Sequence, residues 1–162
     1  MSAPSLTETV SKSLDGTGVS FSDDTISSIY DSTLGHPYEM QALCYQLFDS
    51  QIKGRVEKDQ WDKALAAAAW DMGEDVFENW LARASHQELQ VLLALAAHNG
   101  AAEVAEIKQA LVARQSGVLE TAVGKLLRRL LDKGLVENPS RGQYAIPDPM
   151  FKVYIRLRAE AQ

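Results

Sequence analysis

The stretch of sequence that decides the fold is LLRRLLDKGLVENPSRGQYAI, residues 126–146. Its leucines recur at spacings of three and four, which is the period of one helix face. Gly134 follows them, and a glycine readily adopts the left-handed backbone conformation in which many helices end. Two short extended runs, 135–137 and 143–146, then flank the turn-forming string NPSRG. This stretch therefore predicts a helix followed by a two-stranded β-hairpin.

Upstream residues add two more helices to the same unit. Ser85 and Glu88 form an S-x-x-E pattern, which is typical of a capped helix start, and another helix is expected over 103–113. The helix before the hairpin is expected to span 118–133. Its predicted inward positions are Leu119, Val123, Leu126, Leu127, Leu130 and Leu131. Three helices and a hairpin are the layout of a winged helix, in which the third helix enters the DNA major groove and the hairpin is the wing.

The third of these helices carries a basic face. Lys125, Arg129 and Lys133 follow one another at fourfold spacing with Arg128 alongside, away from the leucine positions. Arg141 is expected at the hairpin tip, where it can reach a phosphate. The predicted DNA-binding residues, which include two expected near the start of the helix, are Ser116, Thr121, Lys125, Arg128, Arg129, Lys133 and Arg141.

Composition excludes several other classes of protein. The chain has 162 residues, of which 46% are apolar and 23% charged, as in ordinary globular proteins. Its single cysteine, Cys44, excludes a disulfide framework and a zinc site built on cysteine pairs. No apolar run approaches the roughly 18 residues that cross a bilayer, and the start MSAPSLTETVSK lacks the pattern of a secretory signal. We therefore expect a cytoplasmic protein with no membrane partner.

Charge is distributed unevenly along the chain. Residues 1–84 hold 6 Lys and Arg against 14 Asp and Glu, whereas residues 85–162 hold 10 against 8. The net charge of -6 excludes a polybasic protein that wraps nucleic acid. The asymmetry predicts two units with different partners: a helical bundle over 1–84, with its first helix over 5–14, and a winged helix with a C-terminal helix over 85–162. The expected fold class is mainly α.

The first of these units carries a motif of its own. Residues 33–48, TLGHPYEMQALCYQLF, resemble a segment of the helical lid that follows the P-loop core in AAA+ and STAND-type ATPases. Residues 18–33 look like the preceding lid helix, and residues 77–96 look like the start of the next domain. The domain order resembles that of archaeal and bacterial relatives of origin-recognition ATPases. The resemblance implies a lid-like helical bundle followed by a winged helix with a two-stranded wing.

The resemblance also implies a role in nucleotide binding, with Gly35, His36 and Pro37 against the adenine or ribose of ATP or ADP. The chain itself has no G-x-x-x-x-G-K-[ST] motif and no strand ending in paired acids. We therefore expect no enzymatic activity from this chain alone. A nucleotide is expected only together with a P-loop ATPase core, in the same chain or in a partner.

Two alternatives to DNA binding remain open at this stage. The winged helix can serve as a protein-interaction module that packs on an ATPase core or on a partner subunit. The chain can also be a free-standing transcriptional regulator. In the first case the basic residues of 118–133 simply solubilise a leucine-rich helix. The sequence is also compatible with an oligomer.

Overall fold

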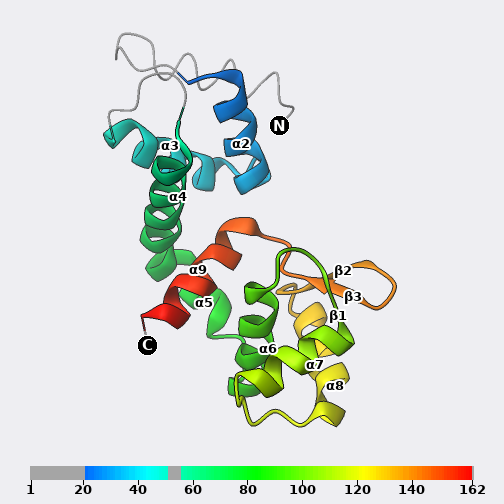
Figure 1. Ribbon diagram of the computed structural model, residues 1–162. Coiled ribbons are helices and arrows are strands. Elements are labelled where there is room, and N and C mark those ends of the chain that lie inside the picture. Colours follow the sequence, from blue (N-terminus) through cyan, green and yellow to red (C-terminus); the bar gives the residue numbers. More distant parts are fainter. Residues whose placement is uncertain (1–20, 51–55, 162) are drawn as a thin grey trace. The chain divides into compact units, whose positions relative to one another are not determined.

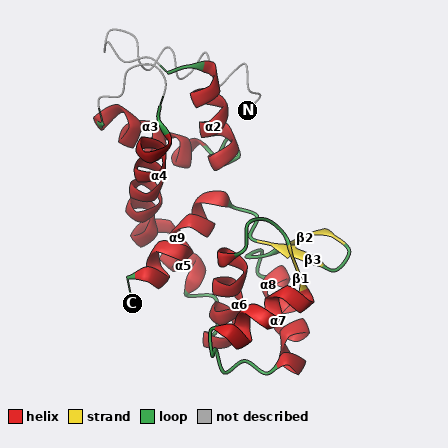
Figure 2. Cartoon of the chain, viewed as in Figure 1, coloured by secondary structure: helices red, strands yellow, loops and turns green. Residues whose placement is uncertain are grey.

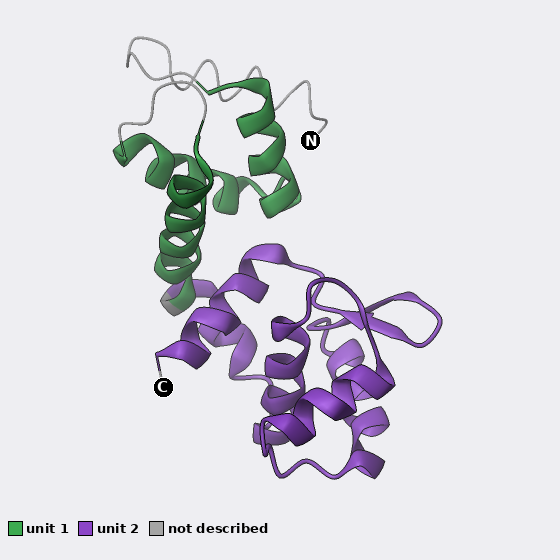
Figure 3. Cartoon of the chain, viewed as in Figure 1, with its two compact units in different colours: residues 1–73 green, residues 74–162 purple. Residues whose placement is uncertain are grey.

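The computed structural model describes residues 21–50 and 56–161 (Figure 1). The described residues are mainly α-helical and contain one small antiparallel sheet, which confirms the expected fold class (Figure 2). It divides into two compact units, unit 1 over residues 1–73 and unit 2 over residues 74–162 (Figure 3). The helix expected over 5–14 lies outside the described residues.

Three helices form the described part of unit 1: α2 (Asp23–Thr33), α3 (Pro37–Asp49) and α4 (Lys58–Met72). Ser22 caps α2, because its Oγ accepts a hydrogen bond of 3.2 Å from the Thr25 amide. Helix α3 packs against both α2 and α4. The small alanine side chains of α4 allow α3 and α4 to pack closely together. The core side chains of unit 1 are Ile26, Ile29, Met40, Leu43, Leu47, Ala64, Ala68, Ala69 and Met72.

A left-handed turn joins α2 to α3. Leu34 has a φ of 49° and Gly35 a φ of 73°, and the Thr33 carbonyl accepts a 2.8 Å hydrogen bond from the His36 amide. A Cβ at Gly35 would lie 2.8 Å from Cε2 of the Tyr30 ring, so this position requires glycine for both its φ and its space. Leu34 is exposed, because α2 ends at Thr33 and the Leu34 side chain no longer faces the core.

We predict that Gly35→Ala lowers the free energy of unfolding of unit 1 by about 1–3 kcal/mol, because alanine is strained at positive φ and meets the Tyr30 ring. Urea unfolding followed by circular dichroism measures the loss. Gly124→Ala is the matched control, since its Cβ would enter open space and alanine favours a helix. Equal stability of the two variants would contradict the prediction.

Unit 2 begins inside a π-helical segment, η1 (Gly73–Phe77), and contains five α-helices, one 3-10 helix and three strands among its described residues. In chain order these are α5 (Glu78–Leu81), α6 (His86–Ala97), β1 (Ala102–Glu103), α7 (Val104–Ala113), η2 (Glu120–Ala122), α8 (Val123–Asp132), β2 (Glu137–Ser140), β3 (Gln143–Ala145) and α9 (Pro149–Glu160).

Helix α6 is the centre of unit 2, since it packs against α7, α8 and α9. Its start is as predicted: Ser85 and Glu88 form a reciprocal capping box. Helix α7 begins within a residue of its expected position, with Glu103 as its N-cap.

The sheet differs from the two-stranded hairpin that the sequence predicts. It has three strands in the order β1-β3-β2, all antiparallel. The added strand β1 pairs Ala102 with Tyr144 and is too short to leave a pattern in the sequence. Strand β2 starts at Glu137, after the buried Leu135 and Val136, and takes in Pro139. Proline is tolerated there because β2 is an edge strand.

An aromatic cluster sets the start of unit 2. Four pairs of rings have centroids 5.1 to 5.5 Å apart, and they join Phe77, Trp80, Phe151 and Tyr154. The Tyr154 hydroxyl also donates a hydrogen bond of 2.5 Å to Glu78 Oε1. Phe77 and Trp80 therefore pack against α9, and the boundary lies after residue 73 rather than after residue 84.

We predict that a fragment of residues 74–162 is more stable than one of residues 85–162 by at least about 3 kcal/mol. The shorter fragment lacks the buried Phe77 and Leu81 and leaves a gap against Phe151. Urea unfolding of both fragments followed by near-ultraviolet circular dichroism tests this. Indistinguishable unfolding midpoints would place the boundary nearer residue 84.

Candidate nucleic-acid interface

Helix α8 separates apolar and basic side chains onto two faces. Its core side is formed by Val123, Leu126, Leu127 and Leu130, all buried. Lys125, Arg128 and Arg129 are exposed on the other side, because residues three and four apart share a helix face. The leucine spacing thus orients three cations toward solvent.

The start of this helix was predicted wrongly. Helix α8 begins at Val123 rather than at residue 118, and Leu119, expected inward, is 70% exposed. The chain turns ahead of it through two residues of positive φ, Gln115 at 51° and Gly117 at 70°. Leu131, also expected inward, is only half-buried.

Two predicted DNA-binding residues therefore lie outside α8. Ser116 is half-buried in the turn after α7, where its Oγ accepts a 3.3 Å hydrogen bond from the Val118 amide. Thr121 is exposed in the short helix η2. Neither residue lies in the first turn of α8. Thr121 is exposed directly before that helix, so it remains near the position that the sequence predicts, whereas Ser116 does not.

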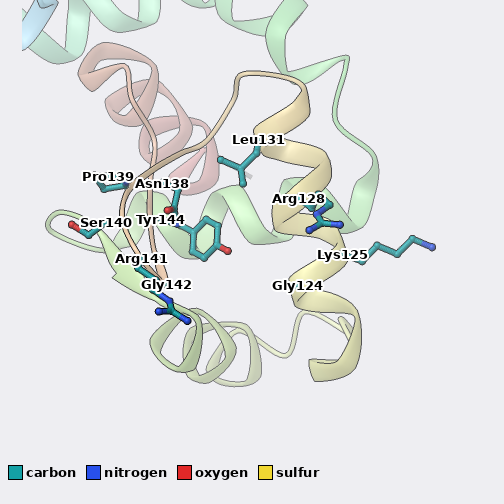
Figure 4. A pocket seen from close by; sticks show the side chains of 10 residues that line it. All are labelled: Gly124, Lys125, Arg128, Leu131, Asn138, Pro139, Ser140, Arg141, Gly142 and Tyr144. Carbon is teal, nitrogen blue, oxygen red and sulfur yellow. The ribbon is translucent and has the colours of Figure 1, made fainter.

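A groove of about 900 Å³ lies between α8 and the β2-β3 hairpin (Figure 4). Tyr144 points from β3 toward α8, and the Lys125 side chain extends away from the hairpin. Arg141 lies in the turn of the hairpin, as predicted. The lining contains three cations and no acid: Gly124, Lys125, Arg128, Leu131, Asn138, Pro139, Ser140, Arg141, Gly142 and Tyr144.

The basic residues of α8 and of the hairpin turn differ from several other cations of unit 2 in their partners. In the described part of the protein, Lys125, Arg128, Arg129 and Arg141 form no ion pair. Other arginines of unit 2 have structural partners. Arg83 donates to the Lys133 carbonyl, Arg156 donates to the Ala96 carbonyl, and Arg158 pairs with Glu78 at 2.7 Å. Lys108, Arg114 and Lys152 also have no ion pair among the described residues, so Lys125, Arg128 and Arg141 are distinguished by lining one groove together.

Lys133 is the predicted DNA-binding residue that has an internal role instead. Its Nζ lies 2.6 Å from Glu88 Oε2, and the Glu88 side chain is 1% exposed. The same carboxylate oxygen accepts a 2.6 Å hydrogen bond from the Ser85 amide. A buried carboxylate needs such partners, so Lys133 neutralises Glu88 and is separated from the basic face of α8.

These contacts determine the direction in which the pKa of the Glu88 carboxyl is shifted. Burial on its own would raise the pKa of the Glu88 carboxyl, but the hydrogen bonds from Lys133 and Ser85 outweigh burial and hold the pKa below its ordinary value. A pKa lower in the folded than in the unfolded chain stabilises the fold at pH values above the ordinary pKa. That contribution is lost as the pH falls through the pKa of the folded state.

We predict that Glu88→Gln lowers the free energy of unfolding by about 2 kcal/mol at neutral pH, because Lys133 loses its counter-charge. The loss shrinks as the pH falls below the ordinary pKa of a glutamate. Glu106→Gln is the matched control, because Glu106 caps α7 in the same way but is more exposed. Urea unfolding at several pH values measures both, and an equal loss in the two variants would refute the role of Lys133.

The residues predicted to contact a nucleotide lie at the start of α3. Pro37 is the first residue of that helix, His36 is its N-cap, and the His36 side chain makes no capping hydrogen bond. Both are exposed, and Gly35 is half-buried against Tyr30. Their contact with ATP or ADP stays a prediction.

Other kinds of site find little support in the described residues. Burial raises the pKa of the Cys44 thiol to about 11, so the thiol is protonated at neutral pH and is a poor nucleophile. No three His, Cys, Asp or Glu side chains cluster in the described ranges as metal ligands would. No helix over residues 21–50 or 56–161 has the length and apolar character to cross a membrane.

Three polar residues of the groove escaped the sequence prediction: Asn138, Ser140 and Tyr144. The sequence places the first two in a turn, whereas they belong to β2, and Asn138 Nδ2 donates a 2.7 Å hydrogen bond to the Gln143 carbonyl. Tyr144 lies on β3 as expected. The direction of the Tyr144 side chain depends on the pairing of β3 with β1, which the sequence does not predict.

The chain belongs to the family DUF8462, a domain of unknown function, whose model matches residues 74–155. The match begins at the residue where unit 2 begins, and it includes α8, the hairpin and most of α9. No curated protein has significant sequence similarity to the chain.

Proposed function

We propose that unit 2 is a winged-helix module that binds double-stranded DNA through α8 and the β2-β3 hairpin. The observation that carries the proposal is the acid-free groove with Lys125, Arg128 and Arg141 among its lining residues. The element order supports it as well, because α6, α7 and α8 precede the hairpin and β1 lies between α6 and α7. This is the order of a winged helix.

In this proposal α8 enters the major groove, which is wide enough for a helix. Arg128 and Lys125 face the bases or the flanking phosphates, and Arg141 at the hairpin turn contacts a phosphate. Gly124 leaves open space at the start of α8, so the DNA backbone can approach the helix closely there.

Charge limits the affinity of this interface. Unit 2 carries as many Asp and Glu residues as Lys and Arg residues, so the attraction to DNA comes from the local cluster rather than from the net charge. About three phosphate contacts would give a slope of roughly −3 in a plot of log affinity against log salt concentration. Binding is therefore strongest at low salt.

We predict that the chain binds a fluorescein-labelled DNA duplex in fluorescence anisotropy, and that Arg128→Ala and Arg141→Ala each weaken binding about tenfold. Each variant also reduces the magnitude of the salt slope by about 1. Lys63→Ala is the matched control, because it removes the same charge from an exposed helix of unit 1. Absence of duplex binding at low salt, or equal affinity of all three variants, would contradict the proposal.

A second candidate function is protein interaction through unit 2. Val112, which is 62% exposed, lines a shallow and largely apolar groove of about 520 Å³ on α7, and the exposed Leu119 lies nearby in sequence. An exposed apolar surface of this kind favours a protein partner. It lies on different elements from the basic groove, so the two functions are separable by mutation.

We also propose that the whole chain acts as the C-terminal, non-catalytic part of an AAA+ or STAND-type ATPase. Residues 33–48 support this by their resemblance to the lid segment, and the exposed His36 after a left-handed turn supports it by its accessibility. ATP or ADP would bind only together with a P-loop core. Co-purification of a P-loop ATPase with the chain tests this context.

A further inference from the structure

Helix α3 exposes aromatic side chains on the side opposite its core. Tyr38 is 49% exposed, Tyr45 63% and Phe48 39%. With the exposed Gln41 between them, their spacings are three, four and three residues, which places all four on one helix face. We call these four residues, Tyr38, Gln41, Tyr45 and Phe48, the α3 stripe.

The α3 stripe is not needed for the packing of unit 1. Leu43 and Leu47 on the other side of α3 are fully buried and provide its contacts with the core. An ordinary surface helix is polar on its outer face, whereas α3 is apolar on two sides. Exposed aromatic rings in a row are characteristic of a protein-binding surface, since tyrosine and phenylalanine anchor interfaces at low entropic cost.

The segment of the chain that carries the α3 stripe is acidic. Residues 21–50 contain five Asp and Glu, of which Glu39 is buried and the other four are exposed, and no Lys or Arg. In the rest of the described unit 1, the two lysines are already paired, Lys58 with Asp62 at 2.5 Å and Lys63 with Asp59 at 3.7 Å. Asp49 follows Phe48 directly and is exposed at the end of the stripe.

We infer that the α3 stripe binds a basic amphipathic helix of another protein. Alternating spacings of three and four match the seam along which two helices pack, so the partner's apolar side chains lie against the aromatic rings. Its lysines and arginines then face the carboxylates of unit 1 and the tyrosine rings, which attract cations. This surface lies in unit 1, so the inference does not depend on DNA binding by unit 2.

Charge argues against a second copy of this chain as the partner. Two copies paired through α3 would bring together two surfaces that carry carboxylates and no basic residue over 21–50, and like charges across an interface weaken it. A basic helix meets the same carboxylates with opposite charge. The complementarity therefore selects the basic partner.

The test uses the full chain and a fluorescein-labelled amphipathic peptide of lysine and leucine, with a glutamate-leucine peptide of the same pattern for comparison. We expect the lysine peptide to bind in fluorescence anisotropy and the glutamate peptide not to bind. The double substitution Tyr45→Ser with Phe48→Ser should weaken binding at least tenfold while leaving every charge in place. Leu34→Ser is the matched control, since it removes an exposed apolar side chain of unit 1 that is not part of the α3 stripe.

Circular dichroism establishes that the double variant remains folded, which is expected because both side chains are exposed. Unchanged affinity of this variant would overturn the inference, because binding would then be general attraction to an acidic protein. Failure of the lysine peptide to bind the unmodified chain would overturn it as well. Concentration-dependent dimerisation that the double variant abolishes, measured by sedimentation, would make a second copy the partner and refute the charge argument.

Discussion

The buried carboxylate of Glu88 is the constraint on which the arrangement of unit 2 depends. It holds the amide of Ser85 at the start of α6 and the ammonium of Lys133 just after α8. The carbonyl of that same lysine accepts a hydrogen bond from Arg83. Because a carboxylate inside a protein requires its partners, these bonds fix the end of α8 against the start of α6. With α8 held in this position, its leucines face the core and its basic residues face solvent.

The positively charged residues of unit 2 include two groups with different roles. Lys133, Arg156 and Arg158 hold elements of unit 2 together, while Lys125, Arg128 and Arg141 remain along the groove. The structural cations lie near carboxylates or carbonyl groups from distant parts of the chain, whereas the others are surrounded by glycine, polar groups and solvent. The distinction between the two groups is one of surroundings, not of residue type.

The sequence predicted the helices and the hairpin because their signals are local. A few consecutive residues are enough to recognise each of these signals: the Ser85 capping box, the leucine spacing of α8 and the glycine in the hairpin turn. What it could not predict depends on distant partners. Three such features join residues that are 40 or more positions apart: the pairing of β1 with β3, the packing of Phe77 on Phe151, and the ion pair of Lys133 with Glu88.

Pro139 on the outer strand of the hairpin has one more consequence. An open strand edge offers unpaired amides to any neighbouring chain, and proteins often protect such edges with proline or with bulges. Strand β2 is exposed along its length and has both, since its register with β3 is irregular next to Pro139. The hairpin is therefore a poor template for edge-to-edge aggregation.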